Sequence, residues 1–457
     1  MIPRAALANI TNWINRTHRK PLILRGARQV GKSTLVRMAA LACEAVLWEV
    51  NLERYPNLYS LFQTRDPQQI LRELALILNL PNPGTRPLLL FLDEIQEAPE
   101  ALVCLRYFYE EMPQLLVVAA GSLLEFTLAK ANFSMPVGRV EYLWLGPLDF
   151  SEFLQGTGAS SLADFLVQWR VGQTIPDALH QKLLEKLREY FLVGGMPEAV
   201  QVFAQTGQFT EAQAVHRSIL DTYKDDFGKY AQGAALEKLR HVFERAPLLL
   251  GQKVKYKNFH PDWKANEIRQ ALELLERAGI VVKVKHSESS GVPLSTQEDP
   301  TVYKLFFVDI GLALNAWGTG GLELSAFLEG RIFEEGKLAE QFAAQALAYS
   351  AGRHEAPRLF YWLREGKSTN AEVDFLLTVR QTVIPLEIKA GTSGSLRSLH
   401  QFMALKKLGK AVRCDLLPPS AQQVNTTVMT PAGKQAVNYQ LQNLPLYLLP
   451  FVFLGEF

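Results

Sequence analysis

Residues 26–33 read GARQVGKS, which fits the pattern G-x-x-x-x-G-K-[ST]. The two glycines allow tight backbone turns that point N–H groups at phosphate oxygens, while the lysine reaches terminal phosphates and the serine hydroxyl can hold Mg²⁺. The residues expected to line this loop are Gly26, Ala27, Arg28, Gln29, Val30, Gly31, Lys32, Ser33 and Thr34. The sequence therefore predicts a loop that binds nucleotide phosphates together with Mg²⁺.

Both flanks of the loop support this interpretation. PLILRG before it is apolar and typical of a strand, and STLVRMAALA after it is typical of the start of a helix. A phosphate placed at that helix N-terminus also interacts favourably with the backbone dipole. A glycine-rich turn that matched the pattern by chance would not be expected to have a strand directly before it and a helix directly after it.

A second motif lies at residues 88–94, LLLFLDE. An apolar run of this kind predicts a parallel strand buried on both faces, and ligands of open α/β sheets bind at the carboxyl ends of such strands. We expect Asp93 to hold Mg²⁺, directly or through water, and Glu94 to polarise the attacking water as a general base. The alternative is a buried strand that runs into a solvated acidic turn.

Two further residues are candidates for the same site. A third apolar strand is predicted at 115–120, and Ser122 follows it, where it could sense a γ-phosphate or simply form a turn or helix cap. Arg139 could bring positive charge to the transition state, from its own chain or from a neighbouring subunit. An ordinary surface salt bridge is an equally good interpretation of Arg139.

The chain resembles a family of uncharacterised prokaryotic AAA-type ATPases that carry a C-terminal domain of unknown function. The resemblance rests on RGARQVGKSTL, FLDEIQEAP, AAGSLLEF, VGRVEYLWLGPLDFSEFL and YFLVGGMPEAV, and extends over roughly residues 1–425. It implies ATP rather than GTP as the nucleotide, and a homo-oligomer, since AAA-type ATPases are often rings. GGMPEAV is typical of the family, but its residues suggest no chemical role and a turn between helices is the default interpretation.

The C-terminal region holds a second constellation of charged residues. AEVDFLL (371–377) and VIPLEIKAG (383–391) are predicted strands that place Asp374, Glu387 and Lys389 in the order D-x(n)-E-x-K. This order resembles the core of the restriction-endonuclease-like fold, which implies that Asp374 and Glu387 bind Mg²⁺ and that Lys389 steadies the attacking water or the developing charge. The same resemblance makes Glu340, in the helix GKLAEQFAAQAL, a further metal ligand. Such a fold can also be an inert scaffold.

Residues 236–310 have the order helix, helix, strand, loop, strand, which predicts a winged helix. Residues 251–286 contain eight Lys or Arg against four Asp or Glu, a local excess of +4. This excess could hold DNA phosphates. The other interpretation, a winged helix that contacts protein and carries solvated lysines, is slightly favoured because no helix here has the Arg, Asn and Gln residues expected for base readout.

Composition sets the remaining expectations. The chain has 457 residues and a formal net charge of +2, which neither requires nor excludes a nucleic-acid partner. Three scattered cysteines (Cys43, Cys104 and Cys414) show no zinc or disulfide spacing and suit a reducing cytoplasm. Neither a signal peptide nor an apolar run long enough to span a membrane is evident, so we expect a cytoplasmic protein with no membrane partner.

The predicted fold class is α/β: an AAA-type P-loop domain with a parallel sheet and a helical lid, followed by a winged helix and a restriction-endonuclease-like α/β domain. The expected domains are an ATPase core (1–155), a helical lid or connector (156–230), a winged helix (231–312), a nuclease-like domain (313–425) and a packed tail (426–457). Two functions fit: an Mg²⁺-dependent ATPase coupled to DNA binding or processing, or an ATP-dependent assembly switch with an inert C-terminal domain.

Overall fold

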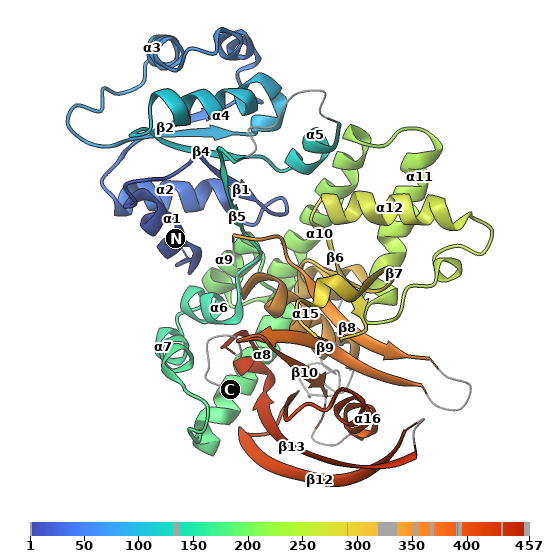
Figure 1. The fold of residues 1–457 in the computed structure, drawn as a ribbon. Coiled ribbons are helices and arrows are strands. Elements are labelled where there is room, and N and C mark those ends of the chain that lie inside the picture. Colours follow the sequence, from blue (N-terminus) through green and yellow to red (C-terminus); the bar gives the residue numbers. More distant parts are fainter. Residues whose placement is uncertain are drawn as a thin grey trace. The chain divides into compact units, whose positions relative to one another are not determined.

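The computed structural model describes residues 2–130, 138–289, 291–318, 336–350, 354–365, 370–389, 391, 395–430 and 433–451. The chain divides into two compact units (Figure 1). The first is Met1–Pro147 with two short later segments, and the second contains most of residues 148–457. The first unit therefore ends eight residues before the boundary expected at residue 155, because α6 (Phe150–Gly156) packs on the helices that follow it in the second unit.

The first unit is built on a five-stranded parallel sheet in the order β2-β3-β4-β1-β5. Its strands are β1 (Leu22–Arg25), β2 (Val46–Asn51), β3 (Leu88–Asp93), β4 (Leu116–Ala120) and β5 (Glu141–Trp144). The parallel α/β sheet predicted from the sequence is thus confirmed. β5, which pairs with β1, was not predicted.

Helices α1 (Ala6–Ile14), α2 (Lys32–Ala42), α3 (Pro67–Leu78), α4 (Pro99–Glu111) and α5 (Leu124–Lys130) complete this unit. Local signals explain where they begin. Asp66 caps α3 by accepting hydrogen bonds from the N–H groups of Gln68 and Gln69, and a proline occupies the first helical position. α2 begins at Lys32, directly after the left-handed Gly31.

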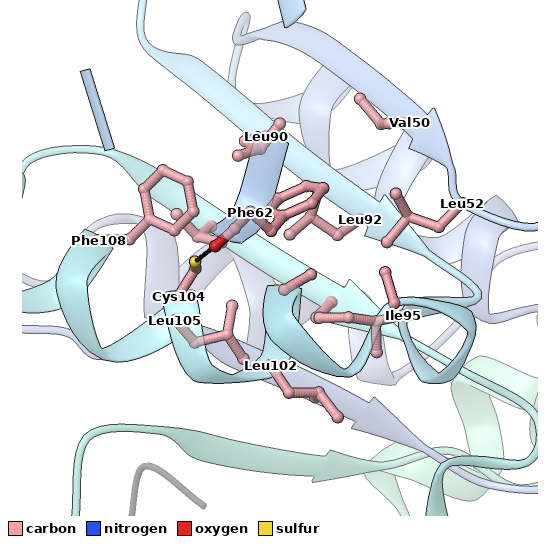
Figure 2. Packing of buried hydrophobic residues seen from close by; sticks show 14 of the residues in the cluster. Val50, Leu52, Phe62, Leu90, Leu92, Ile95, Leu102, Cys104, Leu105 and Phe108 are labelled. Atoms are coloured by element: carbon pink, nitrogen blue, oxygen red, sulfur yellow. Dashed lines mark hydrogen bonds between the residues drawn. The ribbon is translucent and has the colours of Figure 1, made fainter. Parts of the chain in front are cut away.

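The core of this unit is apolar on both sides of β3. Figure 2 shows Leu90 and Leu92 of β3 packed among Phe62, Leu102, Leu105 and Phe108, all fully or almost fully buried. The Cys104 thiol donates to the Phe62 carbonyl at 3.0 Å and is buried, so this cysteine serves packing. The rigid strand places the carboxylates that follow it at a fixed position.

The second unit begins with helices, as predicted for residues 149–225. They are α6, α7 (Ser160–Gln168), α8 (Asp177–Val193), α9 (Pro197–Thr206) and α10 (Phe209–Asp226), followed by α11 (Ala234–Arg245), α12 (Ala265–Arg277), α13 (Ile310–Ala316), α15 (Gly336–Ser350) and α16 (Arg397–Lys406). The gap in the numbering coincides with residues outside the described part of the chain.

Eight strands of the second unit form one mixed sheet in the order β12-β13-β11-β10-β9-β8-β6-β7. They are β6 (Val281–Ser287), β7 (Glu298–Phe307), β8 (Leu359–Arg364), β9 (Ala371–Val379), β10 (Thr382–Ile388), β11 (Lys410–Asp415), β12 (Ser420–Thr430) and β13 (Gly433–Pro445). β6 pairs with both β7 and β8. The two strands expected in a separate winged helix therefore continue the sheet expected in the nuclease-like domain, across the boundary drawn at residue 312.

Residues 426–445 were expected to belong to a packed tail, and this part of the expectation is wrong. They complete the hairpin of β12 and β13, and β13 lies inside the sheet between β12 and β11. Alternating apolar residues on β13, including Val437, Tyr439 and Leu441, are buried against α16. The 3-10 helix that follows, Leu446–Phe451, is largely buried.

The GGMPEAV segment encloses a buried carboxylate. Gly194 has φ +66°, and a Cβ there would lie 2.2 Å from Oδ1 of Asp309. The Gly195 N–H donates to Asp309 at 2.6 Å, and the Leu312 N–H donates at 3.0 Å. Burial raises the pKa of Asp309 to about 6, against these hydrogen bonds. The motif therefore has a structural role that the sequence did not reveal.

Candidate functional site: the phosphate loop and an acidic cluster

The loop at residues 26–33 lies between β1 and α2 and is fixed by backbone geometry. Gly26 has φ +135°, and a Cβ there would lie 2.0 Å from the Leu145 carbonyl oxygen. Gly31 has φ +90° and Gln29 has φ +65°. Only glycine fits the first position, because backbone from the end of β5 passes directly over it.

An arginine that the sequence analysis missed holds the loop by hydrogen bonds to backbone carbonyls. Arg4 donates to the Val30 carbonyl at 3.2 Å and to the Gly146 carbonyl at 2.8 Å, and it is buried. Ala27 and Val30 are also buried, whereas Thr34 is exposed on α2. Arg28 lies near enough to Lys32 to lower the pKa of its ammonium. A buried arginine four residues from the N-terminus has no sequence signal of its own.

Lys32 is folded onto the loop. Its Nζ donates to the Gly26 carbonyl at 3.0 Å and to the Ala27 carbonyl at 2.8 Å. Burial lowers the pKa of Lys32 to about 8, and Glu94 and Asp93 oppose this shift. A buried ammonium held only by neutral carbonyls is ready to exchange them for an anionic group.

Ser33 and Asp93 meet, as the two motifs predict. The Ser33 hydroxyl donates to Oδ2 of Asp93 at 2.9 Å. Burial raises the pKa of Asp93, whereas the Ser33 hydrogen bond lowers it. The pair presents a hydroxyl and a carboxylate oxygen at the loop, which are hard oxygen ligands of the kind Mg²⁺ takes.

Glu94 and Ser122 also lie together, because β4 is next to β3 in the sheet. Oε2 of Glu94 accepts hydrogen bonds from the Ser122 N–H and hydroxyl, both at 3.3 Å, and from Nε2 of Gln96 at 2.7 Å. Glu94 itself has φ +50°, a left-handed conformation. Gln96 is a further residue that the sequence analysis missed; its place two residues after the acidic pair was the available signal.

Arg139 lies on the surface of the same unit. Its Nε pairs with Oε1 of Glu110 at 2.9 Å, and Arg106 pairs with the same carboxylate. Its side chain is 45% exposed. The structure thus places Arg139 in the salt bridge that the sequence analysis kept as the alternative to a catalytic role.

The comparison with protein families agrees with this geometry. Residues 18–154 match the model described as an AAA domain. We refer to this stretch as the AAA domain. Residues 184–323 and 335–435 match two models described as domains of unknown function (DUF8612 and DUF4143). The chain therefore combines a stretch similar to AAA domains with two stretches similar to domains of unknown function.

Other comparisons add little. No curated protein matches the chain. One similar solved structure is described as the Aeropyrum pernix ORC2 protein (ADPNP-ADP complexes), with 16% identity over 72% of this chain and 94% of that chain. The TM-score is 0.31, too low to support an inference. Within the described residues, no helix is long and apolar enough to cross a membrane.

The predicted C-terminal residues converge within the second unit. Glu340 on α15, Asp374 on β9 and Glu387 at the end of β10 lie in one cluster, with Lys389 donating to Oε1 of Glu387 at 2.5 Å. Oδ2 of Asp374 accepts from the Ile388 N–H at 2.8 Å. Oε2 of Glu387 is buried and has no hydrogen-bond partner.

The cluster formed by Glu340, Asp374, Glu387 and Lys389 has two further members, Lys304 and Glu372, which the sequence analysis did not identify. Lys304 on β7 is 1% exposed and pairs with Glu340 at 2.9 Å, with Asp374 at 3.7 Å, and with Glu372. Burial alone would lower the pKa of Lys304, but Glu340, Asp374 and Glu372 more than offset it, so the pKa is raised. Glu372 shares a strand face with Asp374, since side chains alternate along a strand. Lys304 could have been noticed as a charge inside the apolar run VYKLFFV.

Burial of the carboxyls in this cluster opposes the binding of a metal ion. Burial raises the pKa of both Glu340 and Glu387, which favours the protonated carboxyls. Protonation competes with metal binding. In the part of the chain that the structure describes, no three Asp, Glu, His or Cys side chains are placed to hold a metal ion.

Half of the basic residues at 251–286 form ion pairs within the second unit. Ion pairs join Lys253 to Glu365, Lys283 to Glu276, Lys285 to Glu298 and Arg269 to Glu273, at 2.6–3.8 Å. Half of the eight basic side chains are therefore already matched by acids. This pairing supports the interpretation in which the module does not bind DNA through these residues.

Replacing Gly26 with alanine is expected to weaken nucleotide binding. The new Cβ would push the loop away from the Leu145 carbonyl and misplace its N–H groups; a hydrogen bond to a charged group is worth about 1.5–3 kcal/mol, so we expect at least about tenfold weaker ADP binding by calorimetry. Gly84→Ala is the matched control, since Gly84 also has positive φ but open space around it. Equal affinities for the two variants would contradict the geometry of the loop.

Proposed function

We propose that the protein hydrolyses ATP in an Mg²⁺-dependent reaction at the AAA domain. The observation that carries the proposal is the convergence of Lys32, the Ser33–Asp93 pair and Glu94 at one end of the parallel sheet. The carboxyl ends of β1, β3 and β4 meet at this edge, which is where such sheets bind ligands. ATP rather than GTP rests on the resemblance described above.

The loop residues would bind the triphosphate. The backbone N–H groups of the loop and the start of α2 would donate to phosphate oxygens, and the Lys32 ammonium would leave the Gly26 and Ala27 carbonyls for the terminal phosphates. Ser33 and Asp93 would hold Mg²⁺. When bound, that ion neutralises charge that develops between the β- and γ-phosphates.

Glu94 would act on the water. Ser122 and Gln96 hold one of its oxygens, which fixes the direction of the carboxylate and leaves the other to accept a proton. Ser122 would also respond to the γ-phosphate through this contact with Glu94. Because its guanidinium lies on the surface, Arg139 would act on the nucleotide of a neighbouring subunit in a homo-oligomer. To do so it would have to break its ion pair with Glu110.

Glu94→Gln is expected to bind ATP and hydrolyse it slowly. The amide keeps the shape but cannot accept the proton, and a general base contributes typically about 10²–10⁴-fold. The measurement is phosphate release at saturating ATP, with ADP affinity determined on the same protein.

Glu111→Gln supplies the control, since it makes the same chemical change at an exposed position on α4. Lys32→Ala is expected to abolish turnover. Hydrolysis by Glu94→Gln at the wild-type rate, or failure of that variant to bind nucleotide, would remove Glu94 from its proposed role.

We further propose that ATP turnover is coupled to DNA processing by the second unit. The supporting observation is that Asp374, Glu387 and Lys389 come together from adjacent strands, with Glu340 supplied by α15. An inert scaffold that follows an ATP-dependent change of assembly is the second candidate. It is supported by Lys304, whose ammonium already compensates Glu340, Glu372 and Asp374.

Incubation with supercoiled plasmid, ATP and Mg²⁺ separates these candidates. If the cluster cleaves DNA, wild-type protein nicks the plasmid and Lys389→Ala does not, while Lys257→Ala, which removes an exposed lysine, still does. If the domain is inert, nicking is absent and ATP instead changes the sedimentation of the protein. Nicking that survives in Lys389→Ala would assign the activity elsewhere.

A further inference from the structure

The hairpin of β12 and β13 is a long two-stranded ribbon at one edge of the eight-stranded sheet. Its strands pair in continuous antiparallel register from Ser420 opposite Asn443 to Thr430 opposite Gly433. β11 pairs only with residues 440–445 of β13, so the half of the ribbon nearer its turn has no third strand on the β11 side. α16 packs against one face of it (Figure 1).

The other face of the ribbon is exposed and uncharged except at its end. The residues on this face form four directly opposed pairs, all exposed: Gln423–Gln440, Asn425–Asn438, Thr427–Ala436 and Met429–Lys434. Four of the eight side chains are amides, although Asn is depleted in strands. The Gln423 side chain donates a hydrogen bond to the Asn438 side chain on the other strand, so amides from both strands lie together on this face.

The ribbon and α16 lie in a basic part of the second unit. Residues 391–445 contain six Lys or Arg and a single acid, Asp415, an excess of +5 against +2 for the whole chain. Asp415 is buried and pairs with Arg413 at 2.9 Å. Within the described residues no ion pair occupies the other five: Arg397, Lys406, Lys407, Lys410 and Lys434. Five of these six basic side chains have no acidic partner among the residues that the structure describes, whereas at residues 251–286 half of the eight are paired.

We propose that the exposed face of the β12–β13 ribbon binds duplex DNA in the major groove. The face runs from Gln423 to Met429, about 20 Å at 3.4 Å per residue, and the groove, about 12 Å wide, admits a two-stranded ribbon. Asn and Gln pair bidentately with adenine, and the Ala436 and Thr427 methyl groups suit the thymine methyl. Lys434 lies on this face and Lys410 of β11 is in register with Gln440, so these two basic side chains contact the flanking phosphates.

The chemistry of the face favours a duplex over other partners. Single-stranded nucleic acid is bound largely by stacking on aromatic side chains, and this face contains none. A-form RNA has a major groove too narrow for side chains to read. The edge of β12 could instead pair with the same strand of a second copy. Proline and charged residues on an edge strand block such pairing, and β12 has neither, whereas β7 at the opposite edge carries Pro300, Glu298 and Lys304. The charge excess decides for DNA.

This surface shares a partner with the proposed DNA processing but needs neither ATP hydrolysis nor cleavage. Binding is therefore measured with the full chain in EDTA and without nucleotide, so that failure of the ATPase or nuclease proposals leaves the outcome unaffected. The probe is a fluorescent mixed-sequence duplex of 24 base pairs, followed by anisotropy between 50 and 200 mM salt, with the matching single strand as comparison.

Asn425→Asp/Gln440→Glu tests the face itself. It puts one carboxylate on each strand at positions that are not directly opposed, and we expect at least about tenfold weaker duplex binding, since charge repulsion adds to the loss of amide donors. Gln201→Glu/Gln205→Glu makes the same charge change at two exposed positions on α9 and is expected to change binding less than about twofold. An unchanged melting temperature shows that the variants are folded.

Three outcomes overturn the proposal. The first is that the ribbon variant binds the duplex no more weakly than the α9 variant does. The second is that the wild-type protein binds the single strand as tightly as the duplex. The third is that the wild-type protein does not bind the duplex at 50 mM salt. Sedimentation that shows a wild-type dimer converted to monomer by the ribbon variant, with DNA affinity unchanged, would assign the ribbon to self-association instead.

Discussion

The hydrogen bond from Ser33 to Asp93 joins two motifs that lie sixty residues apart in the chain. It exists because β4 is the single strand between β1 and β3 and all three run parallel, so the residues after each strand reach the same edge. Burial of Leu90 and Leu92 on β3 fixes the register of that strand. The positions of Lys32, Glu94 and Ser122 all follow from this one arrangement.

The two charged clusters of the protein differ in how their charges are balanced. In the AAA domain, a buried ammonium and a half-buried carboxylate contact neutral groups, the Gly26 and Ala27 carbonyls and the Ser33 hydroxyl. In the second unit, Lys304 and Lys389 already pair with the carboxylates around them. The first site therefore gains more from a charged ligand, because a buried charge without a partner is costly.

The sequence predicted the AAA site well because its chemistry is local. The loop, the apolar strand and the acids after it are contiguous stretches, and parallel topology brings them together without further information. Arg4 and Gln96 were missed because their contacts depend on where distant backbone passes. Arg139 was left open for the same reason, and its pairing with Glu110 could be seen only in the structure.

The second unit was less predictable. The helix and strand order was recovered, but the pairing of β6 with β8 joins segments about 75 residues apart and has no local signal. The ion pair between Lys304 and Glu340 depends on this long-range sheet, so it could not be predicted from the local sequence. The tail was misassigned because an alternating polar strand such as β12 resembles a solvated segment until its partner is known.

Calorimetric titration of the purified protein with ADP or a non-hydrolysable ATP analogue, with and without Mg²⁺, tests the pocket most directly. Saturable heat with a dissociation constant below about 1 mM, strengthened by Mg²⁺ and lost in Lys32→Ala, is the predicted result. Absence of heat at every nucleotide concentration, or binding indifferent to both Mg²⁺ and Lys32, would contradict the account.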